Sequence, residues 1–134
     1  MTGCLHLINQ TPIEWYCKKQ ATVATATYTS EFVAGRTMTD QLVDLRYTLR
    51  MFGVPIDHHS YAFGDNEAII TQSTIPSSQI TKRHNALAYH RVREAVASGI
   101  LKLFHIPSND NPSDILTKFC GYQQAWPHLK PMLF

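Results

Sequence analysis

The sequence predicts a single α/β domain built on a mixed sheet that is flanked by helices. One observation is an opening pair of short strand-like segments, residues 4–9 and 13–17, joined by the turn-forming sequence Asn-Gln-Thr-Pro. This pattern is typical of a β-hairpin. The other observation is that strand-like and helical segments alternate in the rest of the chain, which favours parallel strands in the second half of the sheet. A length of 134 residues suits one domain, residues 1–134.

A long helix is expected from near Ser30 to Phe52. Its apolar residues recur at spacings of three and four and so form one helical face: Met38, Leu42, Leu45, Leu49 and Phe52. Thr29 or Ser30 can cap the start of this helix. Gly53 followed by Pro55 gives it a stop signal.

The remaining elements continue the alternation. We expect a strand at 60–63, a helix at 66–72, a loop at 73–79, a helix at 83–98 that ends at Gly99, a strand at 100–106 and a loop at 107–112. A last helix is expected to begin at Asn111 or Pro112. Asparagine is a favoured cap, and proline is favoured at the first helical position, so the two residues agree with each other.

Composition excludes several classes of protein. Apolar residues make up 44% of the chain and charged residues 16%, which is too apolar for a disordered chain. The net charge of +2 does not mark a whole-molecule nucleic-acid binder, so any such surface has to be local. The three separated cysteines indicate neither a disulfide framework nor a zinc site. Neither a signal peptide nor an apolar run of membrane length is evident, so a soluble intracellular protein is expected.

Three carboxylates lie where strands end or helices begin. Asp65 follows the strand at 60–63, at the sheet edge where open α/β folds bind ligands. Glu31 and Asp114 are expected in the first turns of helices. Clustered carboxylates repel one another unless a cation neutralises them, and all-oxygen ligation suits Mg²⁺ rather than zinc. Taken singly, each acid has a plainer interpretation, because acidic residues favour helix N-termini and Gly64-Asp65-Asn66 is ordinary turn chemistry.

Four local motifs resemble the ribonuclease H domain that ends copia-type retrotransposon polyproteins. Residues 13–20, IEWYCKKQ, resemble the family segment ISWSSKKQ, and residues 26–32, ATYTSEF, resemble its S-S-T-E-A-E-Y motif. Residues 64–70, GDNEAII, resemble C-D-N-Q-S-A-I, and residues 113–118, SDILTK, resemble A-D-I-L-T-K. The stretch at 83–94 also resembles the family's K-H-I-D-I-R-Y-H-F-I-R-E. These matches occur in order over nearly the whole chain.

The resemblance implies a ribonuclease H-like fold and two-metal hydrolysis of the RNA strand in an RNA/DNA hybrid. It makes Glu31, Asp65 and Asp114 the ligands of two Mg²⁺ or Mn²⁺ ions, and His84 a candidate for assisting proton transfer. The basic residues beside the motifs become candidate phosphate contacts: Lys18, Lys19, Lys82 and Arg83. The implied partners are the hybrid and the upstream reverse transcriptase domain of the same polyprotein, in a cytoplasmic virus-like particle or the nucleus, with no membrane and no small-molecule cofactor.

The family pattern begins with an aspartate-bearing strand, D-A-D-W-A, upstream of the position that Thr2-Gly3 matches, and this chain lacks it. In the family that aspartate bridges both ions, so this chain alone is expected to be inactive or nearly so. The missing strand is the central one. Its loss is expected to leave either a gap between the hairpin and the strand at 60–63 or a re-paired sheet.

The domain is therefore expected to be incomplete at its N-terminus, and the apolar end of the chain at 126–134 fits a fragment there too. Two alternatives to a nuclease domain stay open. One is a catalytically inactive retroelement remnant that binds nucleic acid weakly or not at all. The other is a piece of polyprotein that folds only against its upstream reverse transcriptase.

Overall fold

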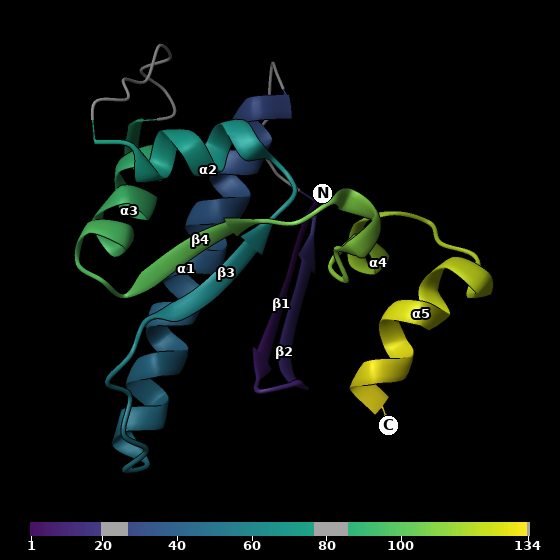
Figure 1. The fold of residues 1–134 in the computed structure, drawn as a ribbon, viewed down its shortest axis with the longest axis horizontal. Helices are drawn as coiled ribbons and strands as arrows, with labels where there is room; N and C mark the ends of the chain where they lie inside the picture. The colour runs from purple at the N-terminus through teal and green to yellow at the C-terminus, as the bar shows by residue number, and fades with distance from the viewer. Residues whose placement is uncertain (20–26, 77–85, 134) are drawn as a thin grey trace.

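The computed structural model describes residues 1–19, 27–76 and 86–133, and the element order follows the predicted alternation (Figure 1). The elements are β1 (Thr2–Ile8), β2 (Thr11–Lys18), α1 (Thr27–Met51), β3 (Ser60–Gly64), α2 (Glu67–Thr74), α3 (Ala86–Ala97), β4 (Leu101–His105), a 3₁₀ turn (Ser108–Asp110), α4 (Asp114–Thr117) and α5 (Tyr122–Leu133). The fold is thus mixed α/β, as predicted, with α5 as an element that the sequence pattern did not indicate.

The strands form two small sheets, which corrects the expectation of one mixed sheet. β1 and β2 pair antiparallel, and β3 and β4 pair parallel. Among the described residues neither sheet has a third strand. Of the two outcomes expected from a missing central strand, the structure shows separate sheets and not a re-paired one. The physical reason is that β1 and β3 have no strand between them to carry the hydrogen bonds from one pair to the other.

The hairpin has two different faces. Thr2, Cys4 and His6 are buried on the face toward α1, where His6 Nε2 lies 3.2 Å from Gln41 Oε1. The alternate residues of β1 lie on the opposite face, since successive side chains of a strand point to opposite sides. Gly3 on that face approaches α4 so closely that an added Cβ would lie 2.5 Å from Thr117 Cγ2. The hairpin is therefore held between α1 and α4.

The core lies between α1, α3 and the β3–β4 pair. Phe32 is completely buried and makes an edge contact with Tyr89, with ring centroids 5.7 Å apart. A second cluster joins Ala62 of β3 to the helices, and its members are Ala62, Ala95 and Leu101, with Met38 and Leu42 packed against them. The predicted apolar face of α1 is confirmed at Met38 and Leu42 but not at Phe52, which lies exposed beyond the end of the helix.

Helix ends were predicted with mixed success. Gly53 and Gly99 both adopt positive φ, at 79° and 71°, and end α1 and α3 as expected. The cap expected at Thr29 or Ser30 is wrong, because α1 already begins at Thr27. Serine and threonine are favoured at caps but tolerated inside helices, so their presence does not fix a boundary.

The C-terminal elements also depart from the prediction. The helix expected to begin at Asn111 or Pro112 begins at Asp114, because the Asn111 side chain forms a local turn instead of a cap. Its Oδ1 accepts hydrogen bonds from the amide and the hydroxyl of Ser113, at 3.1 and 2.8 Å. None of the described helices combines the length and apolar character that a membrane crossing requires.

Candidate functional site

Glu31 and Asp65 approach each other at the C-terminal end of β3. Asp65 directly follows β3, as predicted, and its Oδ2 accepts a 3.2 Å hydrogen bond from Ser108 Oγ. Glu31 is the fifth residue of α1, so its predicted place in the first turn is wrong. The side chain of Asn66 donates from Nδ2 to Glu31 Oε2 and accepts at Oδ1 from the amide of Ile69, 3.2 Å away. One amide thus caps α2 and anchors the glutamate.

The electrostatics of Glu31 differ from those of an ordinary surface carboxylate. Partial burial is the main reason why the pKa of Glu31 is raised above its ordinary value. The negative charge of Asp65 raises this pKa further, while the hydrogen bond from Asn66 opposes the rise. Two carboxylates are therefore held close enough to repel each other, in a position where a cation would stabilise both.

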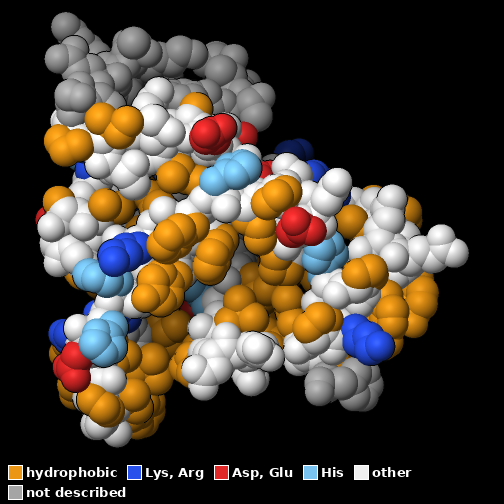
Figure 2. Space-filling view, in the orientation of Figure 1, with side chains coloured by type: hydrophobic (Ala, Val, Ile, Leu, Met, Phe, Trp, Pro, Cys, Tyr) orange, Lys and Arg blue, Asp and Glu red, His pale blue; other side chains and the backbone are white. Residues whose placement is uncertain are grey.

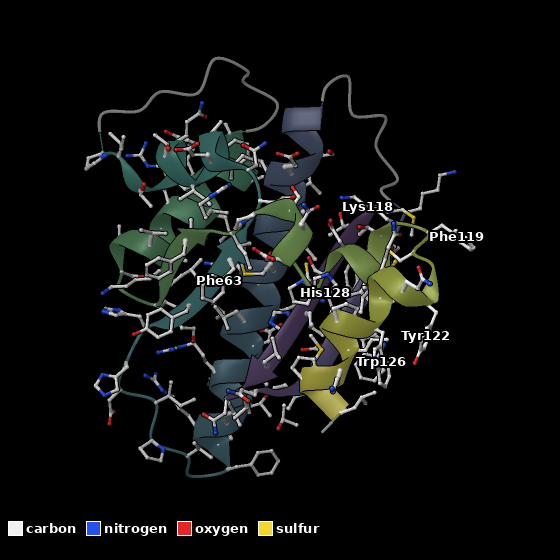
Figure 3. The ribbon with its side chains drawn as sticks, turned by 45° about the vertical axis from the view of Figure 1, so that its right-hand side comes forward. Phe63, Lys118, Phe119, Tyr122, Trp126 and His128 are labelled. Atoms are coloured by element: carbon white, nitrogen blue, oxygen red, sulfur yellow. The ribbon has the colours of Figure 1, made fainter. Side chains whose placement is uncertain are left out.

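Asp114 lies in the first turn of α4, as predicted, and is bound to a lysine. Lys118 Nζ lies 2.6 Å from Asp114 Oδ2, one helical turn away (Figure 3). This hydrogen bond is the main reason why the pKa of Lys118 is raised, and the charge of Asp65 adds to the rise. Lys118 therefore lies in the field of both aspartates and links α4 electrostatically to the end of β3.

The three carboxylates do not close into one metal cage. Within the described residues, no three His, Cys, Asp or Glu side chains lie close enough together to hold a single ion. The donor set nevertheless suits Mg²⁺, which is commonly bound through only one or two carboxylates together with water and substrate phosphates. Glu31 and Asp65 fit that role best, because they lie close enough for the charge of Asp65 to raise the pKa of Glu31, and a cation between them would relieve this repulsion. Asp114 is neutralised by its lysine.

The candidate nucleic-acid residues divide into two groups. Lys18 ends β2 and Lys19 follows it, and both are exposed. Their strand lies beside α4, since Cys17 Sγ donates a 2.8 Å hydrogen bond to the Leu116 carbonyl oxygen. The structure thus places these two lysines next to the element that carries Asp114. The other candidates lie outside the described residues, and they are Lys82, Arg83 and His84.

Sequence reasoning missed three side chains that organise the site: Asn66, Ser108 and Lys118. Asn66 was visible only as part of a turn, although an asparagine next to a candidate acid is a suitable donor. Lys118 could have been found, because its spacing of four residues from Asp114 is the spacing of a helical ion pair. Ser108 could not, because its contact with Asp65 joins two loops that are remote in the sequence.

Comparison with known proteins adds a relationship by sequence. The retrovirus-related Pol polyprotein from transposon RE2 of Arabidopsis thaliana is 28% identical over 116 residues, which are 87% of this chain and 8% of that protein. The corresponding polyprotein from transposon TNT 1-94 of Nicotiana tabacum is 29% identical over 117 residues, 87% of this chain and 9% of that protein. Transposon RE1 of Arabidopsis thaliana supplies a third, 25% identical over 116 residues, again 87% of this chain and 8% of that protein.

No protein-family model matches the chain, and no solved structure matches it. The chain spans less than a tenth of the length of the curated polyproteins that it matches. These similarities cover most of the chain and lead to proteins of one kind. The chain is therefore similar to a region of retrotransposon Pol polyproteins.

Proposed function

We propose that this chain is a ribonuclease H region of a retrotransposon Pol polyprotein, which in the intact polyprotein hydrolyses the RNA strand of an RNA/DNA hybrid. The observation that supports this most is the meeting of Glu31 and Asp65 at the end of β3, with Asp114 linked to the same point through Lys118. These three acids come from three separate elements. They are the acids at which the sequence resembles the nuclease motifs.

In this proposal Glu31 and Asp65 would be the residues that hold Mg²⁺ or Mn²⁺. The ion would supply charge neutralisation and an activated water for phosphodiester hydrolysis. Asn66 keeps the Glu31 carboxylate in place, and Ser108 does the same for Asp65. Asp114 would be available as a further ligand if Lys118 paired with a substrate phosphate instead, since a lysine pairs with either anion.

The exposed lysines at the end of β2 would contact the nucleic-acid backbone. An RNA/DNA hybrid is gripped mostly through phosphates and 2′-hydroxyl groups, with little reading of base sequence. Lys18 and Lys19 lie beside α4, and neither forms an ion pair with a carboxylate of the described residues. Lys82, Arg83 and His84 belong to the same proposal through the sequence resemblance alone.

One observation favours an inactive remnant as the second candidate. All three carboxylates already have protein partners, which are Asn66 for Glu31, Ser108 for Asp65 and Lys118 for Asp114. Each of the three acids is thus held by a side chain of this protein when no metal is bound. A remnant of this kind would show little or no hydrolysis.

The test uses a labelled RNA/DNA hybrid with Mg²⁺ or Mn²⁺. It compares this chain with the same chain preceded by the segment that adjoins the matched region in the transposon RE2 polyprotein. Circular dichroism confirms that both are folded. Cleavage by the extended protein that Asp65→Asn abolishes supports the nuclease proposal. If the extended protein folds but does not cleave, the remnant is the better description.

A further inference from the structure

The sheet formed by β3 and β4 has one face packed on the helices and one face exposed to solvent. Ala62 of β3 packs in the core against α1, so its neighbours Tyr61 and Phe63 point to the opposite face. In the parallel register these two residues pair with Lys102 and Phe104 in turn, and paired residues share a face. The outer face of this sheet therefore presents three aromatic rings and one lysine.

The three rings form one exposed row. Tyr61 and Phe63 are each 62% exposed, and Phe104 is 43% exposed. The ring centroid of Phe104 lies 5.8 Å from that of each of the other two. Figure 1 shows α1 behind this sheet, and Figure 2 shows hydrophobic side chains gathered on the near face. Large apolar side chains that are exposed together, and not singly, mark a surface that binds another molecule.

Cations lie beside the aromatic row and at the start of β3. The two strands contain no aspartate or glutamate, and Lys102 is exposed on the same face as the rings. Arg46 Nη1 donates 2.8 Å hydrogen bonds to the His58 carbonyl oxygen and to Ser60 Oγ. The pKa of Arg46 is lowered, mainly by partial burial and also by the positive charge of Arg50. These three cations form no ion pair with a carboxylate of the described residues, so this side of the sheet suits an anionic ligand.

The combination of rings and cations favours a nucleic acid over a protein as the ligand. The core of a protein–protein interface is poor in lysine, whereas here a lysine lies within the row and no aliphatic side chain does. Single-stranded nucleic acids are bound by aromatic rings that stack on bases and by cations that contact phosphates. Sheets of other nucleic-acid-binding modules hold two or three stacked bases in this way. A double helix suits such a surface less, because its bases are already stacked on one another.

We propose that the outer face of the β3–β4 sheet binds single-stranded nucleic acid. Two or three bases stack on the row of Tyr61, Phe63 and Phe104, and Lys102 contacts a phosphate of the same strand. The binding is tolerant of base sequence, because every base has a π-face. This site uses none of the residues assigned to the nuclease site and goes beyond the proposed hydrolysis.

The probe is a fluorescein-labelled oligodeoxythymidine of about twelve nucleotides, which lies within the usual size of such binding sites. Its affinity for the whole chain is measured by fluorescence anisotropy in the presence of EDTA, so the result does not depend on any nuclease activity. Unlabelled single strands should displace the probe at least about tenfold better than duplex DNA of the same length. Absence of binding, or equal displacement by the duplex, would overturn the proposal.

A set of variants tests whether the probe binds on this face. Phe63→Leu keeps an apolar side chain but removes the π-face, so the affinity should fall about fivefold or more, whereas Phe63→Tyr should bind like the parent chain. Phe119→Leu is the matched control, because Phe119 is fully exposed on another element, and it should leave the affinity unchanged. Lys102→Gln should lower the slope of log affinity against log salt concentration by about 0.7, the value for one phosphate contact in a single strand.

Circular dichroism confirms that all the variants are folded. An unchanged affinity in Phe63→Leu, or an equal loss in Phe119→Leu, would show that the oligonucleotide binds elsewhere and that the proposal is wrong. If ultracentrifugation shows a dimer that Phe63→Leu dissociates, the outer face is a protein interface, and the proposal is wrong as well.

Discussion

Replacing Gly3 with alanine should loosen α4 from the hairpin. A Cβ on Gly3 would lie 2.5 Å from Thr117 Cγ2 and 3.2 Å from both Leu116 Cβ and the Ser113 carbonyl oxygen. A new threonine rotamer relieves only the first of these contacts. The other two involve atoms fixed by the backbone, so α4 itself has to move, and Asp114 moves with it.

Two opposing effects determine how much Gly3→Ala changes the free energy of unfolding. Overpacking of this kind costs about 1–3 kcal/mol. Alanine also restricts the unfolded chain more than glycine does, which returns about 0.4–1 kcal/mol. The expected net loss is about 1–2 kcal/mol in the free energy of unfolding. For a domain of this size that loss lowers Tm by roughly 4–8 °C.

Gly35 provides the matched control within α1. A Cβ there would lie 3.5 Å from Val92 Cγ2, which is an ordinary contact. Gly35→Ala should therefore stabilise the chain by up to about 1 kcal/mol through helix propensity. Thermal and urea unfolding followed by circular dichroism measure both variants. The reasoning fails if Gly3→Ala is as stable as the parent chain, or if the two substitutions shift Tm in the same direction.

Three further predictions concern the core and the carboxylates. Phe32→Ala should lower the free energy of unfolding, measured in urea, by about 3–5 kcal/mol, because the ring is fully buried against Tyr89. A loss below about 1 kcal/mol would contradict this packing. Glu31→Gln should raise the free energy of unfolding at pH 7. Because the pKa of Glu31 is raised in the folded chain, protonated Glu31 contributes stability that is present below its ordinary pKa of 4.5 and is lost as pH rises. Unfolding at pH 7 and at a pH below 4.5 checks that the gain from glutamine disappears in acid. Lys118→Met removes a positive charge that interacts with Asp65, so the affinity for Mn²⁺ measured by calorimetry should rise a few-fold. Weaker binding of Mn²⁺ would mean that the ion does not bind at Asp65.

The secondary structure could be predicted because its signals are local. The apolar spacing of α1 and the glycines that end α1 and α3 act within a few residues of the backbone that they define. The division of the strands into two sheets could not be predicted in this way. Strand pairing joins residues far apart in the sequence, so nothing local in β1 or β3 indicates that the described strands form two separate sheets.

Helix α5 was missed because its sequence argues against a helix. Pro127 and Pro131 lie inside it, and proline removes a helical hydrogen bond. Within the helix Tyr122 and Trp126 lie one turn apart, and their rings stack with centroids 5.4 Å apart (Figure 3). Such a pair contributes only a few tenths of a kcal/mol, about 0.2–0.5 kcal/mol, so it accompanies the helix and does not by itself outweigh the prolines.

The candidate site shows where local reasoning succeeds and where it stops. Asp65 could be placed because a residue that follows a strand lies at the sheet edge whatever the rest of the chain does. Its nearness to Glu31 depends on how α1 packs, and the Asn66 bridge depends on both α1 and α2. The sequence thus indicated which acids to consider, whereas their partners required the structure.

The composition of the strands combines a local sequence signal with tertiary structure. The sequence shows that charged residues lie on β2 and β4 and proline on β2, and that β1 and β3 have neither lysine, arginine, acidic residues nor proline. Whether this difference matters depends on which strand edges are open, and only the structure shows that. An unprotected edge strand invites pairing with another chain, whereas charges and proline on an edge oppose such pairing. Because Asp65 directly follows β3, the packing of β3 against the helices also fixes where the candidate carboxylate lies.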